Sequence, residues 1–254
     1  MINSFLLSLI VGIFIGGVAG YLGSLMVSKK MGLIAGPLGH LTLPGIALAL
    51  LYNFDVSLGA LPFVILGAIL IWFLEMKTDL PEESLTAVIF ATGVSLAFLI
   101  LPAEELETAL VGDIVKVSFW GAVVSLLVSL IIFLILRKIY SKIIFSSISE
   151  DLAKVEGIDT KKYNFIYLLC IAIIVALGVK IVGGFLTAAL VAIPACTSKN
   201  LSKNIFQYSY GATIIGSLSA TLGILLYKSS GYPAGPLIIL VNSFFFVISV
   251  FLKP

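Results

Sequence analysis

The sequence predicts an all-α integral membrane protein, a polytopic bundle of about eight or nine transmembrane helices. Hydrophobic residues make up 60% of its 254 residues, and the mean hydropathy is +1.20. Charged residues make up 11%, whereas a soluble domain carries about 25%. The net charge of +2 and the lack of a basic block with interleaved aromatic residues argue against nucleic-acid binding. We therefore expect this chain to fold in a bilayer.

Nine apolar segments are candidate spans, because about 20 apolar residues cross the hydrocarbon core. The first segment has no charge before Lys29, whereas a signal peptide carries positive charge ahead of a shorter apolar core, so we expect a retained helix. The sixth and seventh segments almost touch, which leaves the count at eight or nine. Residues 104–117 are a candidate re-entrant segment. The nine segments are residues 4–27, 33–52, 58–75, 84–102, 118–137, 164–180, 182–198, 206–227 and 236–252.

The distribution of basic residues predicts how the chain is oriented. With the N-terminus outside and the C-terminus cytoplasmic, 12 of the 15 Lys and Arg residues fall in inner loops, and Lys116, Lys180 and Lys228 fall outside. Inner loops of membrane proteins collect positive charge, so we expect this orientation in the cell membrane. The only long polar stretch, residues 138–163, then lies in the cytoplasm. The chain is expected to form one transmembrane domain over residues 1–254, without a soluble catalytic domain.

A short helix is predicted inside this polar stretch. Ser149 is a suitable N-cap, Glu150 and Asp151 would occupy the first turn, and Gly157 would end the helix with a positive φ. Such an element is either a solvated connector between spans or a docking helix for a separate cytoplasmic protein.

Enzymatic chemistry finds little support in the sequence. His40 is the only histidine, so an H-E-x-x-H metal site cannot form. The chain has no G-x-S-x-G elbow and no phosphate-binding P-loop. Cys170 and Cys196 lie in separate apolar runs and are expected to be small buried side chains. We therefore predict no catalytic residues.

Transport fits the sequence better, because transporters place substrate sites on helices interrupted by Gly or Pro. One interrupted segment surrounds His40, another covers residues 182–195, and a third lies at 231–237. The alternative for the glycines is close helix packing through small residues. An ionisable side chain inside a span is costly and usually functional, which favours a transport role for His40. The expected path-lining backbone positions are Gly36, Pro37, Gly39, Pro44, Gly45, Gly183, Gly184 and Pro194.

Five stretches, in the same order along the chain, resemble the permease subunits of ABC importers for zinc, manganese and iron. The polar segment reads Asp151-Leu152-Ala153 followed by Gly157-Ile158-Asp159, as in the cytoplasmic segment of that family. The other stretches are "HLTLPGIALAL" at 40–50, "ALVGDIVKVS" at 109–118, "KIVGGFLTAALVAIPACTSKNLSK" at 180–203 and "YPAGPLIILV" at 232–241.

The resemblance implies a division of labour among several chains. Two copies of such a permease form the pore, two ATPase subunits bind below it, and an extracytoplasmic binding protein delivers the metal. The helical plan would be related to that of cobalamin and siderophore permeases. No cofactor would be bound permanently, since the divalent metal is the transported ion and ATP is used by a partner subunit. The implied ATPase-docking residues are Glu150, Asp151, Leu152, Ala153 and Gly157.

The sequence departs from the family pattern at one position. The family commonly has an Asp four residues before the histidine, and this chain has Gly36 there. His40 remains the expected metal ligand on the transport path, and Asp113 is a second candidate, with a local ion pair to Lys116 as the structural alternative. An outer acidic cluster would attract the binding protein or the cation, unless it is only a solvated loop. Its residues are Glu104, Glu105 and Glu107.

Two alternative functions stay open from the sequence. One is an ABC permease for a metal chelate such as a siderophore or cobalamin. The other is an ion-coupled secondary transporter that uses His40 in a proton relay, although most of the 13 acidic residues lie in loops.

Overall fold

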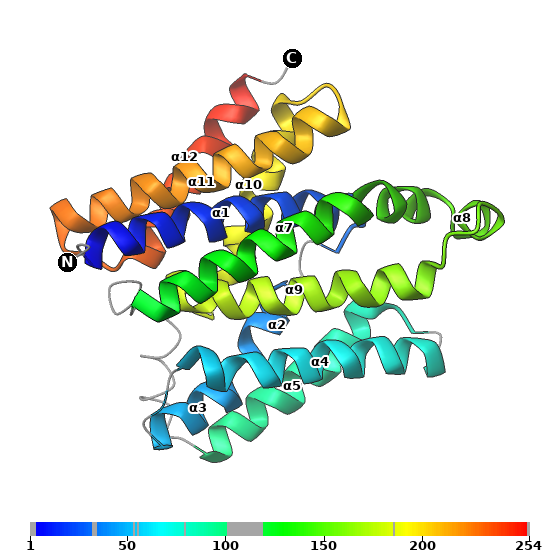
Figure 1. The fold of residues 1–254 in the computed structure, drawn as a ribbon, viewed down its shortest axis with the longest axis horizontal. Helices are drawn as coiled ribbons and strands as arrows, with labels where there is room; N and C mark the ends of the chain where they lie inside the picture. Colours follow the sequence, from blue (N-terminus) through cyan, green and yellow to red (C-terminus); the bar gives the residue numbers. More distant parts are fainter. Residues whose placement is uncertain are drawn as a thin grey trace.

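The computed structural model describes residues 4–31, 35–52, 54, 56–78, 80–100, 119–184 and 186–252, and their regular secondary structure is helical (Figure 1). The helices are α1 (Ser4–Ser28), α2 (Ala35–His40), α3 (Leu43–Tyr52), α4 (Val56–Thr78), α5 (Glu82–Ile100), α7 (Phe119–Ile148), α8 (Glu150–Val155), α9 (Thr160–Val182), α10 (Thr187–Leu201), α11 (Ile205–Ser230) and α12 (Ala234–Phe251).

Eight helical segments of the described chain are long and apolar enough to cross a membrane, which confirms the predicted polytopic bundle. One of them, Ala35–Tyr52, consists of α2 and α3 with a break between them. The predicted span at 182–198 corresponds to α10, which has 15 residues. At 1.5 Å per residue α10 is about 22 Å long, shorter than the hydrocarbon core of about 30 Å. The candidate re-entrant segment at 104–117 lies outside the described residues.

One helix continues well beyond the span predicted for it. The span expected at 118–137 continues as α7 to Ile148, so a large part of the polar stretch 138–163 is helical. The reason is a buried stripe at helical spacing that runs past Arg137 and Lys138; it comprises Leu136, Ile139, Tyr140 and Ile143. Long basic side chains can lie on a continuing helix with their charges in the polar layer, and here they do not mark its end.

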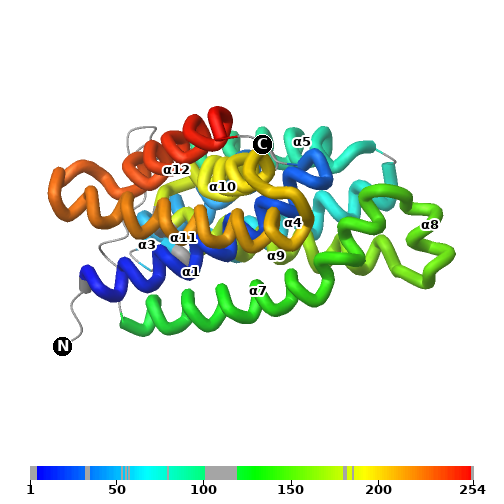
Figure 2. Tube along the Cα trace, turned by 90° about the horizontal axis from the view of Figure 1, so that it is seen from above, coloured from blue at the N-terminus to red at the C-terminus, as the bar shows by residue number. Residues whose placement is uncertain are grey.

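The helices pack in two groups around α9. In Figure 1, α2 to α5 lie on one side of α9, whereas α1 and α10 to α12 lie on the other. The view from above shows α7 along the face opposite α10 and α12 (Figure 2). Among the described helices the most extensive contact joins α1 to α11, where a Cβ on Gly20 would collide with the carbonyl oxygen of Ala212. Small residues allow such backbone contact, which favours helix association in lipid.

Helix α8 lies at the end of the molecule away from the N-terminus, hereafter the α8 end (Figure 1). It connects the extended C-terminal part of α7 to the beginning of α9. The predicted docking helix is therefore held at the tip of two long helices.

Candidate functional site

The span that carries His40 is broken directly after this residue. Thr42 donates from both its backbone N–H and its hydroxyl to the carbonyl of Gly39, and α3 begins one residue later. Pro44 explains the position of the break, because it lacks the N–H that would bond the carbonyl of His40 in a continuous helix. The expectation that the glycines and prolines interrupt the helix here is confirmed.

The imidazole of His40 is oriented by its own helix. Its Nδ1 lies 2.9 Å from the carbonyl oxygen of Gly36, one turn earlier. Because a carbonyl oxygen can only accept, this contact is a hydrogen bond when Nδ1 carries a proton, and the tautomer protonated on Nδ1 has its lone pair on Nε2. The ring also packs edge-to-face on Phe90 of α5, with centroids 5.3 Å apart. A fixed tautomer with its lone pair on Nε2 is the form that binds a metal ion.

Two of the three interrupted segments predicted from the sequence, the one around His40 and the one at 182–195, lie against each other. A Cβ on Gly39 would come within 2.6 Å of the carbonyl oxygen of Gly184, so the backbones of α2 and of the α9–α10 connection are in contact. Gly183 ends α9 with φ of +83°, and its carbonyl accepts from the hydroxyl of Thr187 at 2.7 Å. Gly36 faces Ala188 with more space, because a Cβ there would lie 3.4 Å from the Ala188 Cβ.

The remaining residues predicted to line the transport path lie elsewhere in the structure. Gly45 packs against Gly59 of α4 so closely that a Cβ on either would strike the other's carbonyl. Pro194 is buried inside α10, and Pro37 is half-buried in α2. The structure thus gathers Gly36, Gly39, Gly183 and Gly184 beside the break and places Gly45 at the α3–α4 interface.

The capping of α8 agrees with the sequence prediction. The side chain of Ser149 accepts from the backbone N–H of Leu152 at 3.3 Å. At the other end the N–H of Ile158 bonds the carbonyl of Ala153 and that of Gly157 bonds the carbonyl of Lys154. With φ of +73° at Gly157, these two bonds form a Schellman cap. The helix is short but has defined ends.

The surface of α8 combines charge with exposed apolar groups. Lys154 lies 3.0 Å from Glu150, and this hydrogen bond lowers the pKa of the Glu150 carboxyl. Leu152 is 57% exposed and Val155 is 84% exposed, whereas Ala153 is buried against the rest of the molecule. An exposed apolar pair on a charged, capped helix is suited to contact another protein.

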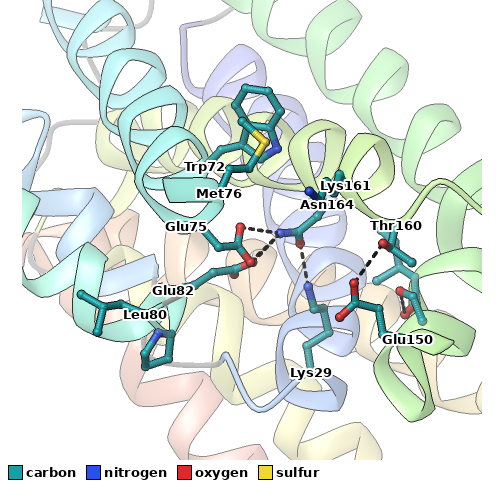
Figure 3. Close-up of a pocket in the computed structure, with 13 residues that line it drawn as sticks. Lys29, Trp72, Glu75, Met76, Leu80, Glu82, Glu150, Thr160, Lys161 and Asn164 are labelled. Atoms are coloured by element: carbon teal, nitrogen blue, oxygen red, sulfur yellow. Dashed lines mark hydrogen bonds between the residues drawn. The ribbon is translucent and has the colours of Figure 1, made fainter. Parts of the chain in front are cut away.

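A polar pocket beside α8 was not predicted from the sequence. It has a volume of about 570 Å³, and its lining comes from the ends of α1, α4, α5, α7 and α9 as well as α8 (Figure 3). Its charged residues are Lys29, Glu75, Glu82, Glu150 and Lys161. Each of them ends or begins a different segment, so no local sequence pattern connects them. Among the described residues no group of three or more His, Cys, Asp or Glu side chains could hold a metal ion.

Several predicted sites fall outside the described residues. They are the second metal candidate Asp113 and the outer acidic cluster of Glu104, Glu105 and Glu107. Cys170 is buried and Cys196 is half-buried, as expected for small side chains in apolar runs.

The comparisons with known proteins cover nearly the whole chain. The sequence pattern of the ABC 3 transport family matches residues 1–253. The manganese import system permease protein ScaB of Streptococcus parasanguinis is 24% identical, over 97% of this chain and 90% of its own length. The high-affinity zinc uptake system membrane protein ZnuB of Buchnera aphidicola subsp. Baizongia pistaciae is 26% identical, over 98% of both chains.

Two solved structures have the same fold. PsaBC from Streptococcus pneumoniae, solved in complex with Fab, matches with a TM-score of 0.83 and 24% identity, over 97% of this chain and 91% of its own. A chain described as a metal-chelate type ABC transporter in an inward-facing conformation matches with a TM-score of 0.78 and 17% identity, over 97% of this chain and 85% of its own. The predicted importer-permease plan, related to that of chelate permeases, is confirmed at the level of the fold.

Proposed function

The chain belongs to the ABC 3 transport family, and from this membership we propose that it is the membrane permease subunit of an ATP-driven importer of a divalent transition metal. The match over residues 1–253 carries this proposal, because it leaves no other domain to which a function could be assigned within this sequence. The names of the relatives favour manganese or zinc as the transported ion. Iron, the third metal expected from the sequence, has no such support.

The proposed importer contains three kinds of chain. Two copies of the permease form the pore, since closed two-fold symmetry is the commonest arrangement of identical subunits. A separate ATPase supplies the energy, in line with the lack of a P-loop in this sequence. An extracytoplasmic binding protein delivers the metal. No cofactor is resident in the permease, and ATP is bound and hydrolysed by the partner subunit.

Helix α8 is the proposed contact with the ATPase. Leu152 and Val155 would enter a groove on the partner, while Glu150 and Asp151 would face its rim. The cap at Gly157 ends α8 at a defined residue, and a contact that transmits force requires such a defined helix end. With α8 bound to a cytoplasmic ATPase, α8 would lie in the cytoplasm and the N-terminus outside, which is the orientation that the distribution of basic residues predicts.

The break between α2 and α3 is the proposed transport path. His40 would bind the travelling cation through Nε2, and backbone carbonyls released by Pro44 would supply oxygen ligands in place of the absent Asp at Gly36. One imidazole with carbonyl oxygens binds more weakly than the three or four protein ligands of a zinc enzyme. Weak binding suits a conduit, which must release each ion that it admits.

The decisive experiment measures metal uptake by His40→Ala and His40→Gln in vesicles that contain the permease, its ATPase and its binding protein. We expect both variants to insert, assemble and hydrolyse ATP, and to import Mn²⁺ or Zn²⁺ at least about tenfold more slowly, since loss of one metal-site group costs about 10- to 100-fold. Phe90→Leu is the control, because it removes the ring packed on His40 and leaves the imidazole.

Two outcomes would contradict the proposal. Import at the original rate by both variants would exclude His40 from the path. Uptake of a ferric siderophore or of cobalamin, without uptake of the free metal ions, would assign the chain to a chelate permease.

A further inference from the structure

One amide side chain connects four helices at the α8 end. Asn164, in the second turn of α9, accepts a hydrogen bond from the ammonium of Lys29 at 2.7 Å. Its amide nitrogen donates to Glu75 in the last turn of α4, at 3.1 Å, and to Glu82 at the start of α5. Figure 3 shows the side chains of Lys29, Glu75 and Glu82 converging on Asn164. These residues are called the Asn164 network.

The charges of the network explain why the amide sits at its centre. Two carboxyl groups that approach one nitrogen repel each other when both are charged, and the ammonium of Lys29 offsets part of this repulsion. Asn164 offers one acceptor and two N–H donors, so it meets the ammonium and both carboxyl groups at once. Hydrogen bonds to charged groups are among the stronger ones in proteins, and linked bonds strengthen one another. The ends of α1, α4, α5 and α9 are therefore held in one relative position.

The network is connected to α8 through the first turn of α9. The hydroxyl of Thr160, the first residue of α9, donates to Glu150 of α8 at 3.3 Å. Asn164 follows Thr160 by about one helical turn, so it lies on the same face of α9. A displacement of α8 would move the first turns of α9, and with them Asn164. The ring of Trp72 of α4 packs on Phe165 of α9, with ring centroids 4.6 Å apart, and this reinforces the contact between α4 and α9.

The middle parts of α4 and α5 hold the break at His40. Leu41, in the turn between α2 and α3, inserts between two glycines: a Cβ on Gly67 of α4 would lie 2.7 Å from one of its methyl groups, and a Cβ on Gly93 of α5 would lie 2.5 Å from the other. Phe90 of α5 packs on the imidazole of His40. The helix pair α4–α5 thus contacts the docking end through charged groups and the break through the buried Leu41 and the ring pair of Phe90 and His40.

We propose that the helix pair α4–α5 transmits movements of α8 to the α2–α3 break, with Asn164 as the positioning residue at the α8 end and Leu41 at the break. Helix α8 packs on α7 and α9, and Leu41 lies between α4 and α5, so a displacement of α8 reaches this turn through the contact of α9 with the pair at the Asn164 network. Since a packed core responds to a shift by changing between discrete arrangements, a small displacement at Asn164 can reposition the turn that carries Leu41. This inference rests on the proposed function, because it concerns how ATP use reaches the transport path.

The first experiment needs neither metal nor ATPase. Hydrogen exchange is measured on the permease in lipid nanodiscs, for the wild type, Asn164→Leu and Asn164→Asp. Both variants remove the two donated hydrogen bonds. Asn164→Asp keeps the size of the side chain and the acceptor for Lys29 but adds a third carboxyl group, whereas Asn164→Leu adds no charge, and a thermal melt of each variant shows that it is folded. We expect exchange to accelerate about tenfold or more both beside the network, at residues 82–90, and at the break, at residues 41–52.

The matched control is Tyr163→Phe, on the adjacent position of α9. It removes the hydroxyl that accepts from Lys142 and leaves the Asn164 network intact. The proposal is overturned if exchange at residues 41–52 is unchanged in both Asn164 variants, or if Tyr163→Phe accelerates it equally.

The second experiment uses the assembled importer. Asn164→Leu should keep ATP hydrolysis but lower metal uptake per ATP about tenfold, and Leu41→Ala should do the same. The double variant should lose little more than either single variant, since interactions that act through one element are not additive. Full uptake per ATP by Asn164→Leu would refute the transmission. Absence of metal uptake by the wild type would refute the proposed function and leave the exchange result standing.

Discussion

Among single residues, His40 and its surroundings show what a local pattern can and cannot predict. An isolated histidine among glycines and prolines predicted a broken helix, and Pro44 accounts for the break. The pattern did not predict that the carbonyl of Gly36 orients the imidazole. A backbone oxygen carries no sequence signal, and the Asp common in the family at that position would have suggested a carboxylate instead.

The contact of α2 with the α9–α10 connection gives a prediction for two neighbouring glycines. Gly39→Ala should destabilise the permease by about 1–3 kcal/mol, because the new methyl group meets the rigid carbonyl of Gly184. Gly36→Ala should be neutral or stabilising by up to about 1 kcal/mol, since the methyl group makes an ordinary contact with Ala188 and helix propensity rises. Thermal unfolding of the purified variants in detergent measures both. Equal effects would contradict the packing described.

Among the helices, α8 was predicted more fully than α7. Ser149, two acidic residues and Gly157 are local signals, and the structure confirms the cap, the first turn and the positive φ. The sequence did not predict where α7 ends, because Arg137 and Lys138 resemble a membrane boundary, while the buried stripe continues beyond them. The Asn164 network could not be predicted at all. Its four members lie in separate parts of the chain, and only the fold brings them together.

The Schellman cap of α8 predicts an order of variants at Gly157. A Cβ at this position meets nothing within 4 Å, so any effect arises from the backbone alone. Gly157→Asn should stay near the wild type because Asn tolerates a left-handed conformation, Gly157→Ala should cost about 1 kcal/mol, and Gly157→Val should be worst. We expect Gly157→Val to remain in the membrane with uptake uncoupled from ATP hydrolysis. Co-purification and ATPase assays test this, and a fully stimulated ATPase bound to Gly157→Val would contradict the docking role.

For the whole molecule, composition and the lengths of apolar runs predicted the fold class, because the bilayer imposes one dominant constraint. Each spanning segment must satisfy its backbone internally, which in an apolar chain means helices. The exact lengths of the individual helices were less predictable. Tertiary packing shortens α10 and lengthens α7, and neither change is encoded in hydropathy alone.

The orientation can be tested with two single cysteines in a variant whose Cys170 and Cys196 are replaced by alanine. Val155→Cys and Tyr232→Cys are suitable because these residues are 84% and 70% exposed, and because α8 and the connection between α11 and α12 lie at opposite ends of the molecule (Figure 1). With the N-terminus outside, a membrane-impermeant maleimide should label Tyr232→Cys on intact cells and Val155→Cys only after lysis. The reverse pattern would invert the proposed topology.

The length of α7 also determines how far α8 stands from the bilayer. Trp120, 76% exposed, is suited to one membrane interface, and Arg137 and Lys138 to the other. At 1.5 Å per residue the distance from Trp120 to Lys138 is about 27 Å, close to the hydrocarbon thickness. Residues 139–148 then extend up to about 15 Å further.

A protein bound to α8 would therefore sit beyond the lipid headgroups by roughly one Debye length, which is about 8 Å at physiological ionic strength. At that height the negative surface potential of anionic lipids is largely screened. The affinity of the ATPase should accordingly depend on the charges of α8 itself and hardly on the lipid composition of the membrane. The same importer could then work in membranes of very different surface charge.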